Sequence, residues 1–126
     1  MNIDPNARYT KTHEWVRPEG DVYAYGITDH AQNALSDIVF VDLPVTGESF
    51  ASGDTIGVIE SVKAASDLYM PVAGEIVAVN KSLTDVPEVV NTDPYGAGWI
   101  VKFKIADPAE YAKMLTAEDY ASLIGE

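Results

Sequence analysis

Short apolar runs separated by turn residues dominate the hydropathy pattern of this chain. The runs are rich in β-branched and aromatic residues, which favour strands over helices. Five strands are predicted from them: Val22–Ile27, Ile38–Val41, Ile56–Ile59, Glu75–Val79 and Trp99–Ile105. Glycine and proline fill the intervals, as at 52–54 and 71–74, and mark turns. This spacing predicts a mainly β fold, a small barrel or sandwich, rather than a parallel sheet with crossover helices.

Helix signals lie at the margins of the strand pattern. Asp29, followed by Gln32, predicts a short capped helix. Asp107 and Pro108 place an N-cap carboxylate and a first-turn proline at the start of a C-terminal helical segment, about 108–124. A second capping pattern inside that segment predicts a second helix.

A five-residue motif occurs twice. Pro44–Glu48 and Pro71–Glu75 share four of five residues at an offset of 27 positions. Such a repeat either arises by chance or marks two similar β-units that face each other across a pseudo-twofold axis. In the second case a hairpin at about 57–70 connects the two units within a single domain, residues 1–126.

Charge and cysteine content narrow the classes of function. Twenty acidic and eight basic residues give a net charge of −12, and such a surface repels nucleic acid and anionic membranes. It suits basic partner surfaces, although solubility alone would explain it equally well. The chain has no cysteine, which excludes disulfides and thiol nucleophiles. The apolar runs are too short for a membrane span and the first residues resemble no targeting signal, so we expect a cytoplasmic location.

Motifs for catalysis or metal binding are missing from the sequence. His13 and Glu14 begin like a zinc-protease motif, but Arg17 stands where the second histidine is required. The other histidine, His30, adds little to a metal site in a chain without cysteine. Nucleophile-elbow and phosphate-loop patterns do not occur. We therefore expect no catalytic residues and no metal, and a carrier or interaction protein rather than an enzyme.

One lysine has an unusual sequence environment. Lys63 is the only basic residue between Arg17 and Lys81, and small residues surround it: Ser61, Ala64, Ala65 and Ser66. An isolated lysine is commonly no more than a solvated surface residue. Here the small neighbours leave the ammonium group open to a modifying enzyme, and a flexible cofactor arm at this point would reach several active sites.

The segment around Lys63 resembles the lipoylation site of the H proteins of the glycine cleavage system, whose modified-lysine motif matches Glu60–Ala64. Further similar motifs follow in order along nearly the whole chain: Thr12–Val16, Gly26–Gln32, Val39–Pro44, Ser66–Asp67, Pro71–Val77, Asn91–Gly96 and Gly98–Trp99. The resemblance implies a barrel-sandwich hybrid of the biotinyl/lipoyl-carrier type, with short peripheral helices and C-terminal helices. It also implies lipoate, amide-linked to Lys63, as the cofactor.

The same resemblance implies a role in glycine catabolism and one-carbon metabolism. The family carries the aminomethyl group of glycine from a pyridoxal-phosphate glycine decarboxylase to a tetrahydrofolate-dependent aminomethyltransferase. It then presents reduced lipoate to dihydrolipoyl dehydrogenase. A lipoate-attaching enzyme is a further expected partner, and the chain itself would be a carrier subunit without an active site.

Other carriers with a modified lysine are alternatives. A biotin carrier would have methionine on both sides of the lysine, where Val62 and Ala64 stand. A lipoyl domain of a 2-oxoacid dehydrogenase usually has aspartate before the lysine and belongs to a longer chain. A lipoyl-relay protein, which donates lipoyl groups to 2-oxoacid dehydrogenase complexes, remains open.

Acidic and hydroxyl residues complete the candidate site. Glu60 and Asp67 lie three residues before and four after Lys63, and we expect them to serve recognition of the attachment site, the alternative being solvated strand-end acids. The resemblance places the segment of Glu14 and Thr12 beside the docked arm. We expect both side chains, on one side of a strand, to hold the protonated amine of the loaded arm, with Asp67 as a second acceptor. The alternative is that Glu14 is a plain surface acid.

Overall fold

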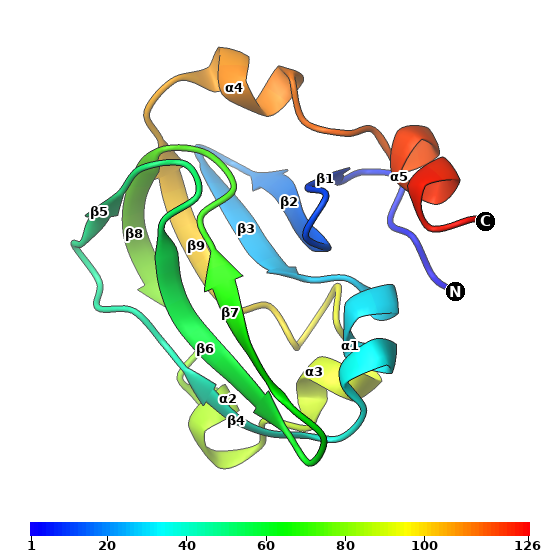
Figure 1. Ribbon diagram of the computed structural model, residues 1–126. Helices are drawn as coiled ribbons and strands as arrows, with labels where there is room; N and C mark the ends of the chain where they lie inside the picture. Colours follow the sequence, from blue (N-terminus) through cyan, green and yellow to red (C-terminus); the bar gives the residue numbers. More distant parts are fainter.

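Two antiparallel β-sheets form the framework of the computed structural model, which describes all 126 residues (Figure 1). The larger sheet has the strand order β1-β2-β3-β9-β8-β5, and the smaller sheet has the order β4-β6-β7. The nine strands are β1 (Arg8–Tyr9), β2 (Glu14–Glu19), β3 (Val22–Ile27), β4 (Ile38–Asp42), β5 (Ser49–Phe50), β6 (Thr55–Ser61), β7 (Ala65–Tyr69), β8 (Gly74–Val79) and β9 (Val101–Ile105). The prediction of a mainly β fold is confirmed.

Five short helices lie around the sheets: α1 (Asp29–Leu35), α2 (Ser82–Asp85), α3 (Val89–Thr92), α4 (Pro108–Ala112) and α5 (Ala117–Leu123). In Figure 1, α4 lies at one end of the molecule and the turn of the β6–β7 hairpin lies at the other. The amino terminus comes back to the carboxyl end, where the Met1 amine is 3.4 Å from Glu126 Oε1. None of the helices is long and apolar enough to cross a membrane.

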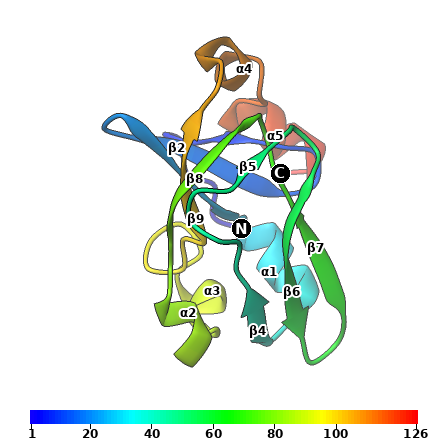
Figure 2. The ribbon, with the colours of Figure 1, turned by 90° about the vertical axis from the view of Figure 1, so that its left-hand side faces the viewer.

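The main core lies between the two sheets, which Figure 2 shows as separate layers. It contains 16 buried residues, among them Ile59 and Leu68 of the hairpin and Phe103 of the larger sheet. A smaller cluster, which includes Trp15 and Tyr120, packs α5 against the β1–β2 end of the larger sheet. The hairpin therefore has one face buried against the core and one face in solvent.

The two copies of the repeated motif adjoin at their ends, where the segments that contain them pair antiparallel. Gly47 N–H donates to the carbonyl of Ile76 at 2.8 Å, and Ile76 N–H donates to the carbonyl of Glu48 at 2.9 Å. Pairing of β5 with β8 continues this contact. These contacts join the segments that lead into and out of the β6–β7 hairpin.

The cap of α1 differs from the prediction by one residue. Thr28, not Asp29, is the N-cap residue, and its Oγ1 accepts a hydrogen bond from Ala31 N–H at 3.1 Å. The Asp29 carboxylate instead accepts from the Gln32 side-chain amide at 2.7 Å and from Asn2 N–H at 2.8 Å. A threonine hydroxyl caps a helix nearly as well as a carboxylate, so the aspartate is free to bind other groups.

The cap of α4 agrees with the prediction and allows a test. The Asp107 carboxylate accepts from Ala109 N–H at 3.0 Å, and Pro108 occupies the first helical position. We expect Asp107→Ala to lower the free energy of unfolding by about 1 kcal/mol, because a helix amide loses its acceptor. Urea denaturation measures the loss, and Asp107→Asn, which keeps an oxygen acceptor, is the control. Equal stabilities of the two variants would contradict the capping role.

Candidate functional site

The β6–β7 hairpin ends in a three-residue turn, Val62–Ala64, that is closed by its own backbone and by Ser61. Ser61 N–H donates to the carbonyl of Ala64 at 2.8 Å. The Ser61 hydroxyl oxygen accepts from the backbone amides of Lys63 at 3.1 Å and Ala64 at 3.0 Å. The conformation of the turn therefore does not depend on the Lys63 side chain.

Lys63 is exposed at the tip of the hairpin. Its only polar side-chain contact runs from Nζ to the carbonyl of Ala34 in α1, at 3.3 Å. It takes part in none of the four ion pairs of the structure. An amide formed at Nζ would keep one N–H for the Ala34 carbonyl, so acylation would disturb no other contact.

Glu60 and Asp67 share the outer face of the hairpin. Glu60 is paired with Ala65 and Asp67 with Val58, and these alternate positions point to the same side of a two-stranded ribbon. Both acids are exposed, while Ile59 on the opposite face is buried. The two carboxylates thus border the lysine tip on one surface that no core residue shares.

Glu14 lies in a cleft of about 340 Å³ at the base of the hairpin. The β1–β2 turn, residues 10–13, forms one wall and is called the cleft loop below. All lining residues come from three segments: Thr10, Thr12, Glu14, Ser52, Gly53, Tyr69, Met70 and Pro71. Strand β7 leads from the turn that holds Lys63 to Tyr69, so the lysine tip and the cleft lie at opposite ends of one strand.

The Glu14 carboxylate is buried, and no cationic side chain pairs with it. Its residue is 2% exposed, and it makes none of the four ion pairs. The hydroxyls of Thr10 and Thr12 both donate to Oε1, and the backbone amide of Tyr69 also favours the charged form. Burial outweighs these hydrogen bonds and raises the pKa of Glu14 above its ordinary value of 4.5. An ammonium group in the cleft would supply the missing positive charge.

The structure brings together part of the expected docking set. Thr12 and Glu14 meet in the cleft, whereas Asp67 lies outside its lining, exposed on β7 two residues before Tyr69. Sequence reasoning missed Thr10 and Tyr69. The spacing of two residues between Thr10 and Thr12 was a usable signal, but Tyr69 reaches the cleft only because the hairpin packs on the larger sheet.

The two histidines, which make only a weak case for a metal site in the sequence, lie together. The ring centroids of His13 and His30 are 4.6 Å apart. No group of three histidine, cysteine, aspartate or glutamate side chains is arranged to hold a metal ion. His13 Nδ1 is instead 2.9 Å from the hydroxyl of Tyr120 in α5, so the histidine pair contacts the C-terminal helix.

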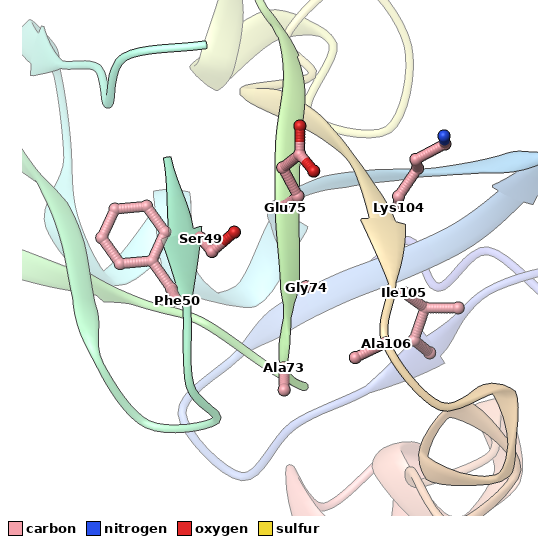
Figure 3. A pocket seen from close by; sticks show the side chains of 8 residues that line it. All are labelled: Ser49, Phe50, Ala73, Gly74, Glu75, Lys104, Ile105 and Ala106. Carbon is pink, nitrogen blue, oxygen red and sulfur yellow. The ribbon is translucent and has the colours of Figure 1, made fainter. Parts of the chain in front are cut away.

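A second hollow, of about 350 Å³, lies at the β5–β8–β9 edge of the larger sheet (Figure 3). Figure 3 shows Glu75 and Lys104 on neighbouring strands, with Ile105 next to Lys104 and with Ser49 between Glu75 and Phe50. Glu75 and Lys104 are paired in register and both are exposed. No buried polar side chain lines this hollow, so the cleft that contains Glu14 is the stronger candidate for a ligand site.

Comparison with known proteins gives consistent matches. Residues 7–126 match the family model described as Glycine cleavage H-protein. The glycine cleavage system H protein of Alteromonas mediterranea is 56% identical over 126 residues, which cover 99% of this chain and 98% of the relative. That of Chromohalobacter salexigens is 56% identical over 124 residues, covering 98% and 95%. A crystal structure of a glycine cleavage system H protein from Mycobacterium marinum matches with a TM-score of 0.89 at 40% identity, and covers 98% of this chain and 100% of that chain.

Proposed function

The chain belongs to the glycine cleavage H-protein family, and we propose that Lys63 carries its lipoyl group. Membership makes the chain a lipoyl carrier of the glycine cleavage system. The observation that supports Lys63 is the exposed hairpin tip, whose backbone hydrogen bonds close without the lysine side chain. Lipoate amide-linked to Nζ supplies a disulfide that takes up the aminomethyl group and two electrons.

Glu60 and Asp67 serve recognition of the tip by the lipoate-attaching enzyme. Both lie exposed on one face of the hairpin beside Lys63. A basic surface of the partner would contact the two carboxylates without disturbing the core, and such contacts set orientation and association rate.

We expect Glu60→Lys combined with Asp67→Lys to slow lipoylation at least about tenfold, the effect of losing roughly 1.4 kcal/mol of favourable interaction. The melting temperature should stay nearly unchanged because neither acid contacts the core. Intact-mass spectrometry follows lipoylation, and Asp21→Lys with Glu110→Lys is the control, with the same charge change at exposed sites remote from the tip. A parallel loss of stability and lipoylation would assign a structural role to the two acids.

The cleft protects the aminomethyl cargo. Its amine, when protonated, pairs with the Glu14 carboxylate, while the hydroxyls of Thr10 and Thr12 keep that carboxylate oriented. Asp67 lies on the strand between the lysine tip and the cleft, where it offers a second acceptor. The low exposure of Glu14 indicates that bulk water has little access to this end of the cleft.

The chain acts as a substrate of its partners and has no catalytic residues of its own. We assign as partners the glycine decarboxylase, the aminomethyltransferase, the dihydrolipoyl dehydrogenase and the lipoate-attaching enzyme. The net charge of −12 would steer the chain toward basic entrances to their active sites, and the association rates should fall with ionic strength.

The decisive experiment asks whether glycine decarboxylase accepts the purified, lipoylated chain. We expect glycine-dependent release of carbon dioxide with the lipoylated chain and none with the unmodified chain. The relay alternative is tested with a lipoyl-transferring enzyme and an unmodified lipoyl domain of a 2-oxoacid dehydrogenase. Lipoyl transfer without acceptance by the decarboxylase would favour the relay role.

A further inference from the structure

A chain of hydrogen bonds connects helix α5 to the cleft through Thr28, Tyr120 and His13. We propose that His13 is a positioning residue, through which α5 holds the cleft loop in place against Glu14. The inference rests on the proposed docking role of Glu14. It assigns the positioning of the cleft loop around Glu14 to a helix that lines no part of the cleft.

His13 fixes the end of the cleft loop at two points. Its carbonyl accepts from Thr28 N–H at 3.0 Å, and its ring Nδ1 lies 2.9 Å from the Tyr120 hydroxyl. The φ angle of His13 is 69°, in the left-handed region, which is strained for a residue with a side chain. Such a conformation persists only where neighbouring contacts hold it, and these two bonds tie His13 to elements outside the cleft loop.

In the hydrogen bonds that link Thr28, Tyr120 and His13, only one set of donor directions gives every hydroxyl proton an acceptor. Thr28 Oγ1 accepts from Ala31 N–H and lies 2.7 Å from the Tyr120 hydroxyl. Thr28 therefore donates to Tyr120, and Tyr120 donates to Nδ1 of a neutral His13 that carries its proton on Nε2. Thr28 and Tyr120 are both 0% exposed, so a reversed order would leave a buried hydroxyl proton without an acceptor.

The surroundings of His13 favour its neutral form. His30 faces it from α1 and Tyr120 from α5, Glu14 follows it in sequence, and Tyr9 stacks on Tyr120. Burial and then the proximity of His30 lower the pKa of His13 from 6.5. Because the folded pKa lies below the unfolded value, the stability gained from the neutral form is complete above pH 6.5. It is lost as the pH falls through the folded pKa.

The cleft loop connects His13 to the hydroxyls that bind the Glu14 carboxylate. His13 N–H donates to the carbonyl of Thr10 at 3.2 Å, and Thr12 directly precedes His13. Thr10 and Thr12 supply the two hydroxyls that bind Glu14. A displacement of His13 therefore moves both hydroxyl donors and opens the buried carboxylate to water.

Tyr120→Phe tests the inference with Tyr9→Phe as its matched control. The two rings stack with centroids 4.5 Å apart, and both residues are 0% exposed. The Tyr120 hydroxyl belongs to the chain that ends at His13, whereas the Tyr9 hydroxyl donates to the carbonyl of Asp4 at 2.6 Å. Each substitution deletes one buried hydroxyl from the same aromatic stack, so a general loss of packing affects both variants alike.

The first measurement is an NMR titration of the full, unlipoylated chain. We expect Tyr120→Phe to raise the pKa of His13, because Nδ1 loses its hydrogen-bond donor. The pKa of Glu14 should fall toward 4.5, because water reaches the carboxylate and desolvation is the main cause of its raised value. Tyr9→Phe should leave both titrations unchanged. An unchanged Glu14 titration in Tyr120→Phe, or equal changes in the two variants, overturns the inference.

The second measurement uses the lipoylated, aminomethyl-loaded chain. Tyr120→Phe should release formaldehyde severalfold faster than Tyr9→Phe at the same extent of lipoylation, and equal rates overturn the inference. Failure of the proposed function gives a different result. In that case the wild type is not lipoylated at Lys63, or releases formaldehyde as fast as Glu14→Gln, while the titration of the unlipoylated chain still decides whether His13 positions Glu14.

Discussion

The Lys63→Arg chain is expected to fold like the wild type and to accept no lipoate. A guanidinium group does not form the amide that a lysine amine forms, so the carrier function should be lost completely. The fold should be unaffected because Lys63 is exposed and its single polar side-chain contact is with Ala34. Intact mass after incubation with the lipoate-attaching enzyme measures modification, and thermal unfolding measures stability.

Two other exposed lysines provide controls for this experiment. Lys11→Arg and Lys81→Arg remove amines outside the hairpin and should leave lipoylation complete. Attachment removes one positive charge, which takes the formal net charge from −12 to −13, and isoelectric focusing should detect this difference. Peptide mapping that finds lipoate on Lys11 or Lys81 would refute the assignment of Lys63.

Glu14→Gln is expected to shorten the lifetime of the aminomethyl-loaded form at least about tenfold, because a hydrogen bond to a charged group contributes roughly 1.5–3 kcal/mol. Water that attacks the carbon between sulfur and nitrogen releases formaldehyde and ammonia and leaves the thiol. Glutamine keeps the volume of the side chain but removes the charge that pairs with the amine. Formaldehyde release measures the lifetime, and lipoylation of Lys63 should be unchanged. A release rate equal to that of the wild type would eliminate the protective role of Glu14.

The same variant should be more stable than the wild type at neutral pH. Burial raises the pKa of Glu14 in the folded chain above 4.5, so the folded state favours the protonated carboxyl. The stability that this group contributes is complete below pH 4.5 and is lost as the pH rises through the folded pKa. Urea denaturation at several pH values should therefore show a gain for Glu14→Gln at neutral pH that disappears in acid. A stability difference independent of pH would show that Glu14 does not titrate in this way.

The strand pattern predicted the elements whose apolar residues are local and continuous. Strands were predicted at Val22–Ile27 and Trp99–Ile105, and the structure has β3 at Val22–Ile27 and β9 at Val101–Ile105, two residues shorter at its start. The pattern does not predict β2, because its first three residues, from Glu14 to Val16, are all buried and so show no alternation. The charged and proline residues that follow, from Arg17 to Glu19, conceal the rest of the strand.

The candidate site divides in the same way between local and long-range features. Lys63 was recognisable because its small neighbours and its motif lie within a few positions of it. The wall of the cleft opposite Glu14 includes Tyr69, more than fifty positions along the chain, and no local spacing predicts that contact. The bond from His13 to Tyr120 joins residues 107 positions apart, and it depends on how α5 packs against β1 and β2.

The position of Lys63 and the cleft at opposite ends of strand β7 affects how the cargo passes to a partner enzyme. An arm attached to Lys63 would find the cleft by an intramolecular encounter, and a short flexible tether gives an effective concentration in roughly the millimolar range. Dilution of the protein would leave the docked fraction unchanged, whereas each partner enzyme competes at its own concentration. A partner that withdraws the arm must therefore bind the chain or the cargo tightly enough to compete with the high effective concentration of the arm at the cleft. A variant whose cleft binds the loaded arm more weakly would pass its cargo to partner enzymes at lower enzyme concentrations. It would also lose the cargo to water more readily.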